Sequence, residues 1–260
     1  MNGHSPRLVA AAGICKSYPR VKALAPLSFN ILPGEKVALV GPSGSGKTTL
    51  LYLLAGILQP DEGVLIVDGV PLSSVRNGKE LSQLVGMVHQ QYDLVPHLSV
   101  LHNVLAGRLG QWSLLRSLIS LVWPRDQQLA EEALAQMGIA DKVNERTSHL
   151  SGGELQRVAI ARLMVQSSRI ILADEPVSSL DPARAEDLLG LLTGLAMTDG
   201  KTLVASMHSP YLIKKYFSRV IGLREGVLQF DMLASEMTEE VLDRLYGLEQ
   251  PETVLWGGGN

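Results

Sequence analysis

The chain has 260 residues, 46% of them apolar, which suffices for one large domain or two small ones around a packed core. Its formal net charge of −3 argues against the strongly basic face of a nucleic-acid binder, so we expect no nucleic-acid partner. The single cysteine, Cys15, excludes an internal disulfide framework and fits a reducing compartment. The start lacks the pattern of a secretion signal, and no apolar run reaches the roughly eighteen residues that a membrane span needs.

The N-terminal part of the chain favours strands separated by turns. Residues 8–12 and 27–31 are predicted strands, the second because apolar and polar residues alternate along it. Between them, residues 14–19 are a predicted turn region that carries one aromatic, Tyr18. Further along, residues 63–69 indicate a strand closed by a turn.

A glycine-rich stretch follows a predicted apolar strand and precedes a predicted apolar helix that ends near residue 58. Residues 41–48 match the phosphate-loop pattern G-x-x-x-x-G-K-[ST], and this strand–loop–helix setting disfavours an ordinary glycine-rich turn. The glycines let backbone N–H groups point at phosphate oxygens, and the helix N-terminus adds positive charge. Lys47 would contact the β- and γ-phosphates, and the Thr48 hydroxyl would ligate Mg²⁺. We predict that nucleotide is bound by Gly41, Ser43, Gly44, Ser45, Gly46, Lys47, Thr48 and Thr49.

Helical periodicity replaces the strand pattern from about residue 92 to residue 150. Residues 127–137 carry apolar side chains at helical spacing, and residues 112–123 form a notably apolar helix. This second helix would face a partner or a membrane surface, or it would pack on its own subdomain, and the sequence leaves both interpretations open.

A second glycine-rich helix start lies at residues 151–154. Ser151 and Glu154 fit a capping box, while Gly152 and Gly153 leave the mouth of the helix unobstructed. A well-capped helix explains these residues by itself. In a phosphate-loop protein, however, a second open helix mouth favours a second contact with phosphate.

Acidic residues follow residues 169–173, a continuous apolar run typical of a strand buried on both faces of a parallel sheet. Since neighbouring strand residues face opposite sides, Asp174 and Glu175 would do different jobs, one holding Mg²⁺ and the other orienting the attacking water. The alternative is two solvated acids. His208, after another apolar run, would reach the γ-phosphate or hold Glu175, and Gln90 would place its amide near the metal. Sequence chemistry alone leaves both assignments open.

Together these stretches resemble the motifs of the ATP-binding-cassette ATPases, and the resemblance runs over nearly the whole chain. It implies ATP and Mg²⁺ as the nucleotide and metal. The resemblance assigns catalysis to Glu175, His208 and Lys47, the metal to Thr48, Gln90 and Asp174, adenine stacking to Tyr18, the signature motif to Ser151, Gly152, Gly153 and Glu154, and the D-loop to Asp181.

The same resemblance implies an α/β fold: a phosphate-loop ATPase core with a mixed sheet, an antiparallel β subdomain and an inserted α-helical subdomain. We expect one domain over residues 1–250, with core segments 1–91 and 151–250 and a helical subdomain at about 92–150. Residues 251–260 should form a loose tail. The family also implies a head-to-tail homodimer, in which each ATP lies between the phosphate loop of one subunit and the signature motif of the other.

A closer resemblance, to the ATP-binding subunits of bacterial phosphonate and phosphite importers, is carried by residues 90–95, 101–110, 112–123 and 242–247. It implies ATP hydrolysis coupled to uptake of a phosphonate or related phosphorus oxyanion, with transmembrane permease subunits and a separate substrate-binding protein as partners. We expect the chain on the cytoplasmic face of the bacterial inner membrane. Two positions depart from the family: His89 stands where phenylalanine is usual, and Glu154 where glutamine is commoner.

Other functions stay open at this point. Within the family, the chain would serve amino-acid uptake, lipoprotein release or cell division. In another class, it would be an ATP-binding adaptor on a soluble enzyme complex, without transport. A small-molecule kinase is disfavoured because it leaves residues 151–154 unexplained.

Overall fold

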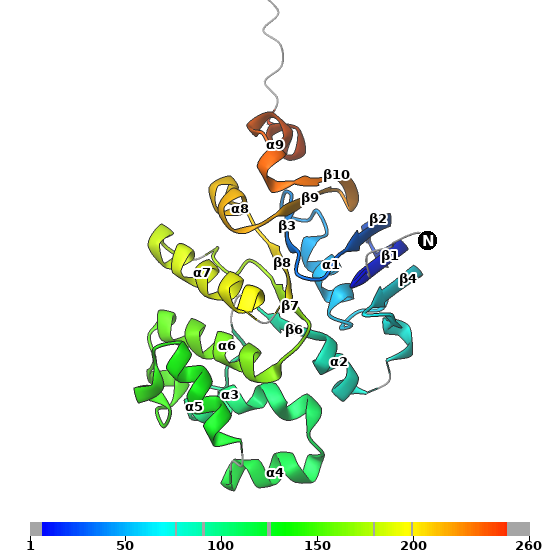
Figure 1. The fold of residues 1–260 in the computed structure, drawn as a ribbon. Coiled ribbons are helices and arrows are strands. Elements are labelled where there is room, and N and C mark those ends of the chain that lie inside the picture. Colours follow the sequence, from blue (N-terminus) through cyan, green and yellow to red (C-terminus); the bar gives the residue numbers. More distant parts are fainter. Residues whose placement is uncertain are drawn as a thin grey trace, which may run out of the picture.

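The computed structural model describes residues 7–75, 77–89, 92–123, 126–178, 180–198 and 200–248. Its strands form two sheets, and most of its helices lie beside the larger one (Figure 1). The strands are β1 (Val9–Tyr18), β2 (Val21–Ile31), β3 (Lys36–Val40), β4 (Glu62–Val67), β5 (Val70–Pro71), β6 (Val85–Val88), β7 (Ile170–Ala173), β8 (Thr202–Ser206), β9 (Arg219–Arg224) and β10 (Val227–Leu233). The α-helices are α1 (Lys47–Leu54), α2 (Gly78–Leu84), α3 (Val100–Leu105), α4 (Leu114–Val122), α5 (Gln127–Gln136), α6 (Gly152–Gln166), α7 (Pro182–Thr198), α8 (Pro210–Tyr216) and α9 (Glu239–Tyr246).

The smaller sheet is antiparallel, with strand order β2-β1-β4-β5. The turn predicted over residues 14–19 is wrong, because β1 continues to Tyr18 and pairs there with Val21 of β2. The register shifts between Ala11 and Ile14, and again on each side of Lys16, and Gly13 in the first of these steps has a φ of +61°. This irregularity interrupts the sequence pattern without ending the strand, since the side chain of Ile14 returns to the core.

The larger sheet is mainly parallel and has the order β10-β9-β3-β8-β7-β6. β3 pairs in parallel with β8 and β9, and β7 pairs in parallel with β8 and β6, whereas β10 is antiparallel to β9. Parallel strands bring their carboxyl ends to one edge. The segments that follow β3, β7 and β8 are therefore neighbours there, and ligands of open α/β sheets bind at such edges.

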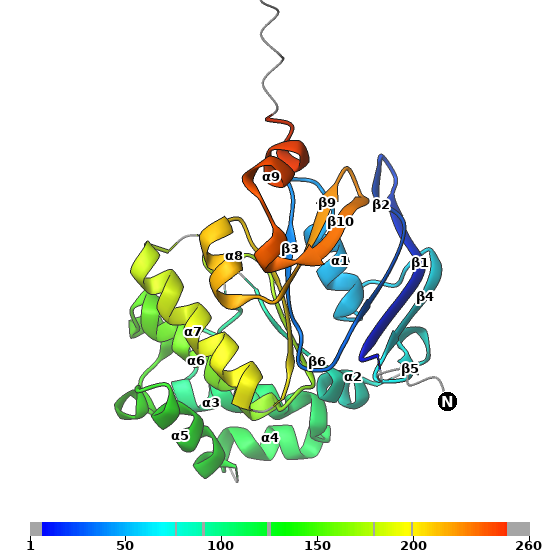
Figure 2. The same ribbon diagram turned by 45° about the horizontal axis from the view of Figure 1, so that its top comes forward.

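Two hydrophobic clusters fill the space on opposite faces of the larger sheet. Along β3, Val37 and Leu39 belong to the cluster shared with α1 and the smaller sheet, while Ala38 and Val40 belong to the cluster shared with the helices α3, α5, α6 and α7. This alternation follows from the period of two in a strand. Figure 2 shows the smaller sheet and α1 on one side of β3, and α6 and α7 on the other.

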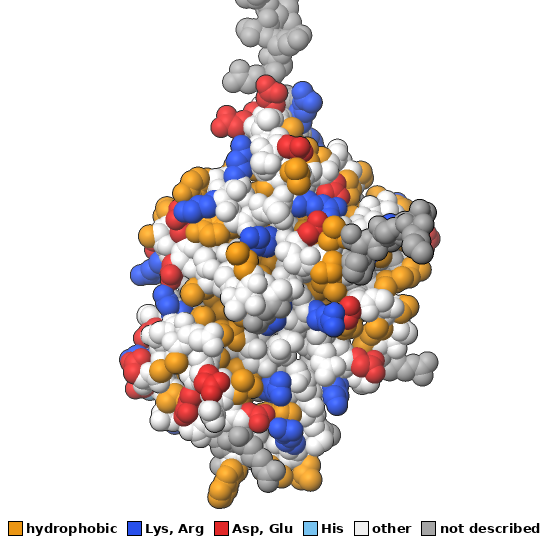
Figure 3. Space-filling view, viewed as in Figure 1, with side chains coloured by type: hydrophobic (Ala, Val, Ile, Leu, Met, Phe, Trp, Pro, Cys, Tyr) orange, Lys and Arg blue, Asp and Glu red, His pale blue; other side chains and the backbone are white. Residues whose placement is uncertain are grey.

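The helices α3, α4 and α5 lie between β6 and β7 in the chain, and α3 and α5 pack against α6. Within the described parts of residues 92–150 there is no strand, and the one isolated bridge joins Ser99 and Arg146. Helix α4 is the most peripheral, and hydrophobic side chains protrude at the lower end of the molecule over it (Figure 3). In the described residues, no helix has the length and apolar character needed to cross a membrane.

Candidate functional site

The loop between β3 and α1 is built so tightly that two of its glycines cannot be replaced. Gly41 has a φ of +149°, and a Cβ atom there would lie 2.0 Å from the carbonyl oxygen of Leu223 in β9. Gly46 caps α1 with a φ of +101°, and a Cβ atom there would lie 2.6 Å from the carbonyl oxygen of Ala23 in β2. A Cβ on Gly44, in contrast, would meet no atom within 4 Å. The loop is therefore closed against the two sheets and open above Gly44.

Lys47, the first residue of α1, is held inside this loop. Its Nζ donates to the carbonyl oxygens of Gly41 at 2.7 Å and Pro42 at 3.1 Å, and only 6% of the residue is exposed. Burial lowers the pKa of the Lys47 ammonium, while the carboxylates of Glu175 and Asp174 act in the opposite direction and raise it. The loop thus keeps a cation beside the helix N-terminus, the arrangement that favours a bound anion.

A hydroxyl–carboxylate pair joins α1 to the end of β7. The Thr48 hydroxyl donates to Asp174 Oδ1 at 3.3 Å. The Ser206 hydroxyl, on the last residue of β8, donates to the same carboxylate oxygen at 2.8 Å and accepts the backbone N–H of Glu175 at 2.6 Å. Sequence reasoning did not identify Ser206. Its one signal was a hydroxyl at the end of an apolar strand, two residues before His208.

Glu175 and His208 form the next pair along this edge. His208 Nε2 lies 2.9 Å from Glu175 Oε1, and holding this carboxylate is one of the two roles predicted for the histidine. The prediction that strand alternation separates Asp174 from Glu175 is wrong. β7 ends at Ala173, and Glu175 has a φ of +46°, a left-handed conformation that is uncommon outside glycine. The backbone turn, held by Ser206, is what aims the two carboxylates differently.

A cavity of about 430 Å³ opens beside this pair and is lined by the segment after β7 and by residues of α7 and α8. Asp181, the predicted D-loop residue, lies at the start of α7, where its carboxylate accepts the backbone N–H of Arg184 at 3.1 Å. The predicted metal ligand Gln90 lies outside the described residues. His89, the unusual residue before it, packs edge-on against the Tyr52 ring at a centroid distance of 5.9 Å.

The capping box predicted at the start of α6 is present. Ser151 Oγ donates to Glu154 Oε2 at 2.7 Å, and the backbone N–H of Ser151 donates to the same oxygen at 2.8 Å. These bonds lower the pKa of the Glu154 carboxyl. A Cβ on Gly152 or Gly153 would meet nothing within 4 Å, so the helix mouth is open. Among the hydrogen bonds of the described residues, none links residues 151–154 to the phosphate loop.

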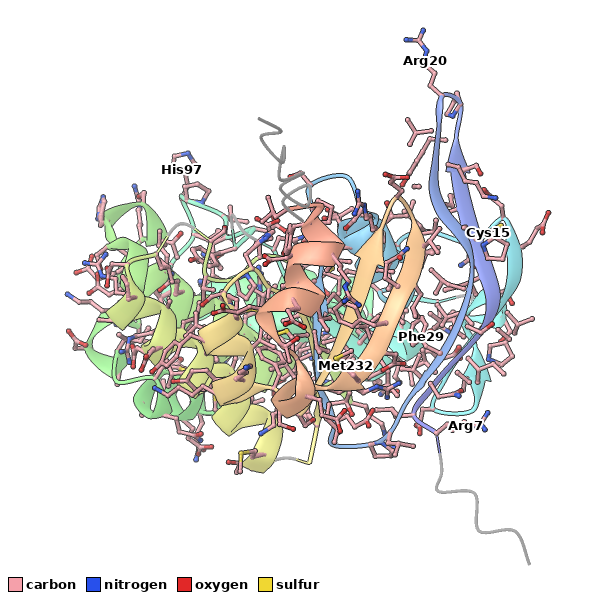
Figure 4. The ribbon with its side chains drawn as sticks, turned by 90° about the horizontal axis from the view of Figure 1, so that it is seen from above. Arg7, Cys15, Arg20, Phe29, His97 and Met232 are labelled. Carbon is pink, nitrogen blue, oxygen red and sulfur yellow. The ribbon has the colours of Figure 1, made fainter. Side chains whose placement is uncertain are left out.

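Tyr18 stands near the tip of the β1–β2 hairpin, where the side chain of Arg20 projects from the molecule (Figure 4). Tyr18 is 43% exposed. Further down the same hairpin, Ala23 touches the phosphate loop at Gly46. The same hairpin therefore carries an exposed aromatic ring and contacts the phosphate loop.

The glycine loop around a buried lysine, with a hydroxyl–carboxylate pair at the carboxyl edge of a parallel sheet, defines a nucleotide-binding protein of the phosphate-loop class. Residues 24–178, more than half of the chain, match the family model described as ABC transporter, and the chain belongs to that family. It is an ABC ATPase, with ATP hydrolysis coupled to transport. The α/β fold with a mixed sheet and an antiparallel β subdomain, expected from the sequence, is confirmed.

Known proteins of this family resemble the chain over most of its length. It is 46% identical over 240 residues to the phosphonates import ATP-binding protein PhnC of Pseudomonas putida, covering 92% of this chain and 89% of that protein. It superposes on the solved structure of cbiO1 from Clostridium perfringens, described as part of the ABC transporter complex cbiONQ, with a TM-score of 0.77, 26% identity and coverage of 92% and 94%. It also superposes on a dimeric post-hydrolysis state of the ATP-binding cassette MJ0796, bound to ADP and Pi. There the TM-score is 0.73 and the identity 30%, and the match covers 87% of this chain and 98% of that one.

Proposed function

We propose that the chain powers the import of a phosphonate or a related phosphorus oxyanion by hydrolysing ATP. The observation that carries the substrate class is the 46% identity, over 92% of the chain, to a protein named for phosphonate import. The geometry at the edge of the larger sheet supports the hydrolysis. There Lys47, Asp174 and Glu175 bring one cation and two carboxylates to the open side of the phosphate loop.

The residues present fit Mg²⁺. This ion prefers oxygen ligands in an octahedral arrangement, and the Thr48 hydroxyl and Asp174 carboxylate lie within hydrogen-bond distance of one another. Thr48 and Asp174 would hold the ion directly or through water, with Gln90 as a further ligand. When bound, Mg²⁺ neutralises charge on the β- and γ-phosphates.

The chain's own groups divide the remaining work. The ammonium of Lys47 contacts the β- and γ-phosphates, and the backbone N–H groups of residues 44–49 point at their oxygens. Glu175 orients the attacking water and accepts its proton, while His208 keeps the Glu175 carboxylate in place. The exposed ring of Tyr18 stacks on the adenine. Ser206 fixes the backbone from which both acids project.

Two copies of the chain complete each ATP site. The open mouth of α6, with Ser151, Gly152, Gly153 and Glu154, has no hydrogen bond to the phosphate loop of its own chain among the described residues. A partner in head-to-tail orientation would bring that helix mouth to the γ-phosphate, and Asp181 to the same interface. The solved cassette MJ0796, which is dimeric and bound to ADP and Pi, supports a dimer of this chain. Transmembrane permease subunits and a separate substrate-binding protein complete the importer, with this chain on the cytoplasmic face of the bacterial inner membrane.

The test is growth of cells that lack the gene for this chain. With an alkyl phosphonate as the sole phosphorus source, the wild-type gene should restore growth and a Lys47→Ala gene should not. Growth on inorganic phosphate should be equal in all strains, which controls for general fitness. Full growth of the deletion strain on the phosphonate would contradict the proposed substrate class, provided that the genome encodes no second such ATPase.

A further inference from the structure

The starts of α6 and α7 border a common cavity. Its volume is about 170 Å³, and its lining includes Gly153 in α6 and Arg184 in α7. Gly153 belongs to the open mouth of α6. Arg184 holds Asp181, since Arg184 Nε lies 3.3 Å from Asp181 Oδ2 and the Arg184 backbone N–H donates to Asp181 Oδ1 at 3.1 Å. The cavity therefore lies between the two segments that the proposed dimer presents to the ATP of the other copy.

An ion pair joins the two helices beside this cavity. Arg157 Nη2 donates to Asp187 Oδ2 at 2.6 Å, and both residues line the cavity. Arg157 lies five positions after Gly152, the first residue of α6, and Asp187 lies five positions after Pro182, the first residue of α7. The pair therefore connects α6 and α7 at the same depth, a little more than one turn inside each helix.

A third helix fixes the direction of the Arg157 guanidinium. Arg157 Nη1 donates to the backbone carbonyl of Met137, the C-cap residue of α5, at 2.7 Å. Gly138 follows with a left-handed φ of +70°, as is common where a helix ends. Carbonyls at a helix C-terminus have no partner within the helix, so a cation is favourable there. The planar guanidinium is thus bonded to α5 on one side and to α7 on the other.

Apolar packing holds α6 and α7 together, but it does not fill the space between their starts. The two helices pack against each other (Figure 2), and Ala161 of α6 and Leu192 of α7 are buried in the same hydrophobic cluster. In contrast, the side chains of Arg157 and Asp187 are 32% and 57% exposed and lie at the cavity. Exposed ion pairs add little to the free energy of unfolding. The domain should therefore fold without this pair, whereas the spacing of the two helix starts depends on it.

We propose that the Arg157–Asp187 pair is a positioning contact for the ATP-bound dimer. It holds the mouth of α6 and the Asp181 segment at the spacing in which both reach the nucleotide of the other copy. This inference rests on the proposed function, because it concerns the half of each ATP site that the second copy supplies. Arg157 and Asp187 act through Gly153 and Asp181, not by touching the nucleotide. Lys47 and the phosphate loop form the other half, so nucleotide binding by a single chain does not need the pair.

The variant Asp187→Ala tests the proposal, because alanine favours the helix and removes the acceptor of Arg157. Glu186→Ala is the matched control. Glu186 is the preceding residue of α7, and its change removes an ion pair of the same 2.6 Å length, to Lys215 of α8. Both variants are made in full-length chains that carry Glu175→Gln, the change expected to hold the ATP-bound dimer. The dissociation constant of the dimer is measured by analytical ultracentrifugation with Mg²⁺-ATP, and the ADP affinity of the single chain by calorimetry.

We expect Asp187→Ala to raise the dissociation constant of the dimer about 4- to 100-fold. One lost hydrogen bond weakens a contact about 2- to 10-fold, and a symmetric dimer contains each contact twice. The ADP affinity and the melting temperature should equal those of the Glu175→Gln parent. The Glu186→Ala chain should match the parent in all three measurements.

A second variant, Arg157→Met, keeps most of the apolar stem and removes both hydrogen bonds of the guanidinium. It should weaken the dimer at least as strongly as Asp187→Ala. Combining the two changes should weaken the dimer no further than Arg157→Met alone, because the pair is already lost. If the two effects multiply instead, the residues act separately and the inference is overturned.

Three other results would overturn the inference: an Asp187→Ala dimer as tight as the parent dimer, equal weakening by Glu186→Ala, or weakening that comes only with a loss of ADP affinity and a lower melting temperature. A parent chain that binds ADP but does not dimerise with ATP would contradict the proposed two-copy ATP site, and the inference with it. A parent chain that dimerises, beside an Asp187→Ala chain with the same dissociation constant, would contradict the inference alone.

Discussion

His208 Nε2 and Glu175 Oε1 lie 2.9 Å apart, although 33 positions separate the two residues in the chain. The pair forms because β7 and β8 are neighbours in the parallel sheet and end at the same edge. One side chain follows each strand, and the left-handed backbone at Glu175 turns its carboxylate toward the histidine. This relationship is the basis for assigning the proton-accepting role to Glu175.

Replacing Glu175 with Gln should stop steady-state hydrolysis and leave ATP binding intact. Glutamine keeps the shape and a hydrogen bond to His208 but cannot accept a proton, and such general-base effects amount to roughly 10²–10⁴-fold in rate. Phosphate release and ATP binding are measured on the same preparation, and the variant should accumulate as an ATP-bound dimer in gel filtration. Glu186→Gln, which removes the partner of Lys215, is the control and should turn over normally. Near-wild-type turnover by the Glu175 variant would rule out the role.

Removing the hydroxyl of Ser206 should impair hydrolysis more than nucleotide binding. Ser206→Ala removes the hydrogen bond that the hydroxyl donates to Asp174 Oδ1. It also removes the acceptor of the Glu175 backbone N–H. Hydrogen bonds to charged groups are worth about 1.5–3 kcal/mol, so we expect a fall of roughly 10- to 150-fold in kcat. The Mg²⁺ concentration for half-maximal activity should rise, because Asp174 is less well oriented. An unchanged Mg²⁺ requirement together with full activity would show that Ser206 is not needed to place the acids.

Motifs whose residues lie close together in the chain could be predicted from the sequence. Hydrogen-bonded pairs between residues far apart in the chain could not. The phosphate loop and the Ser151–Glu154 capping box each depend on neighbours a few positions apart. Ser206 was not predicted because its partners, Glu175 and Asp174, lie 31 and 32 positions away in the chain. They become neighbours of Ser206 only because β7 and β8 are adjacent in the sheet. The turn expected near Tyr18 failed for a local reason, since the irregularity at Gly13 breaks the period of β1 without breaking its pairing.

Tyr18 should contribute to ATP binding by stacking on the adenine. Aromatic stacking is worth about 1–3 kcal/mol per base, so Tyr18→Ala should weaken ATP binding roughly 5- to 150-fold and Tyr18→Trp should restore most of it. Because Tyr18 is 43% exposed, removing its ring should leave the fold intact, which circular dichroism can check. If Tyr18→Ala binds ATP as tightly as wild type, the stacking prediction is wrong.

Leu115 in α4 should lie in the contact with the permease. Leu115 is 69% exposed, and Leu118 in the same helix and Trp123, the residue just after it, are exposed as well. Leu94, which precedes α3 in the chain, packs against the core, so a charge there would test folding instead. Leu115→Asp should leave ATP binding by the isolated chain unchanged but abolish permease co-purification and uptake, because an unpaired charge would be buried on docking. Met197→Asp in α7, at the same 69% exposure, is the control. Normal uptake by the Leu115 variant would place the permease elsewhere.

The central claim is that hydrolysis at this site drives phosphonate uptake. The most direct measurement is the accumulation of a radiolabelled phosphonate by cells that carry either the wild-type or the Glu175→Gln chain. The amount of chain bound to the membrane should be equal in the two strains. We predict that wild-type cells accumulate the label against its gradient and that unlabelled phosphonate competes with it. Glu175→Gln cells should take up no more than cells without the gene. Accumulation by the Glu175→Gln cells at the wild-type rate, or no accumulation of phosphonate in wild-type cells, would contradict the account.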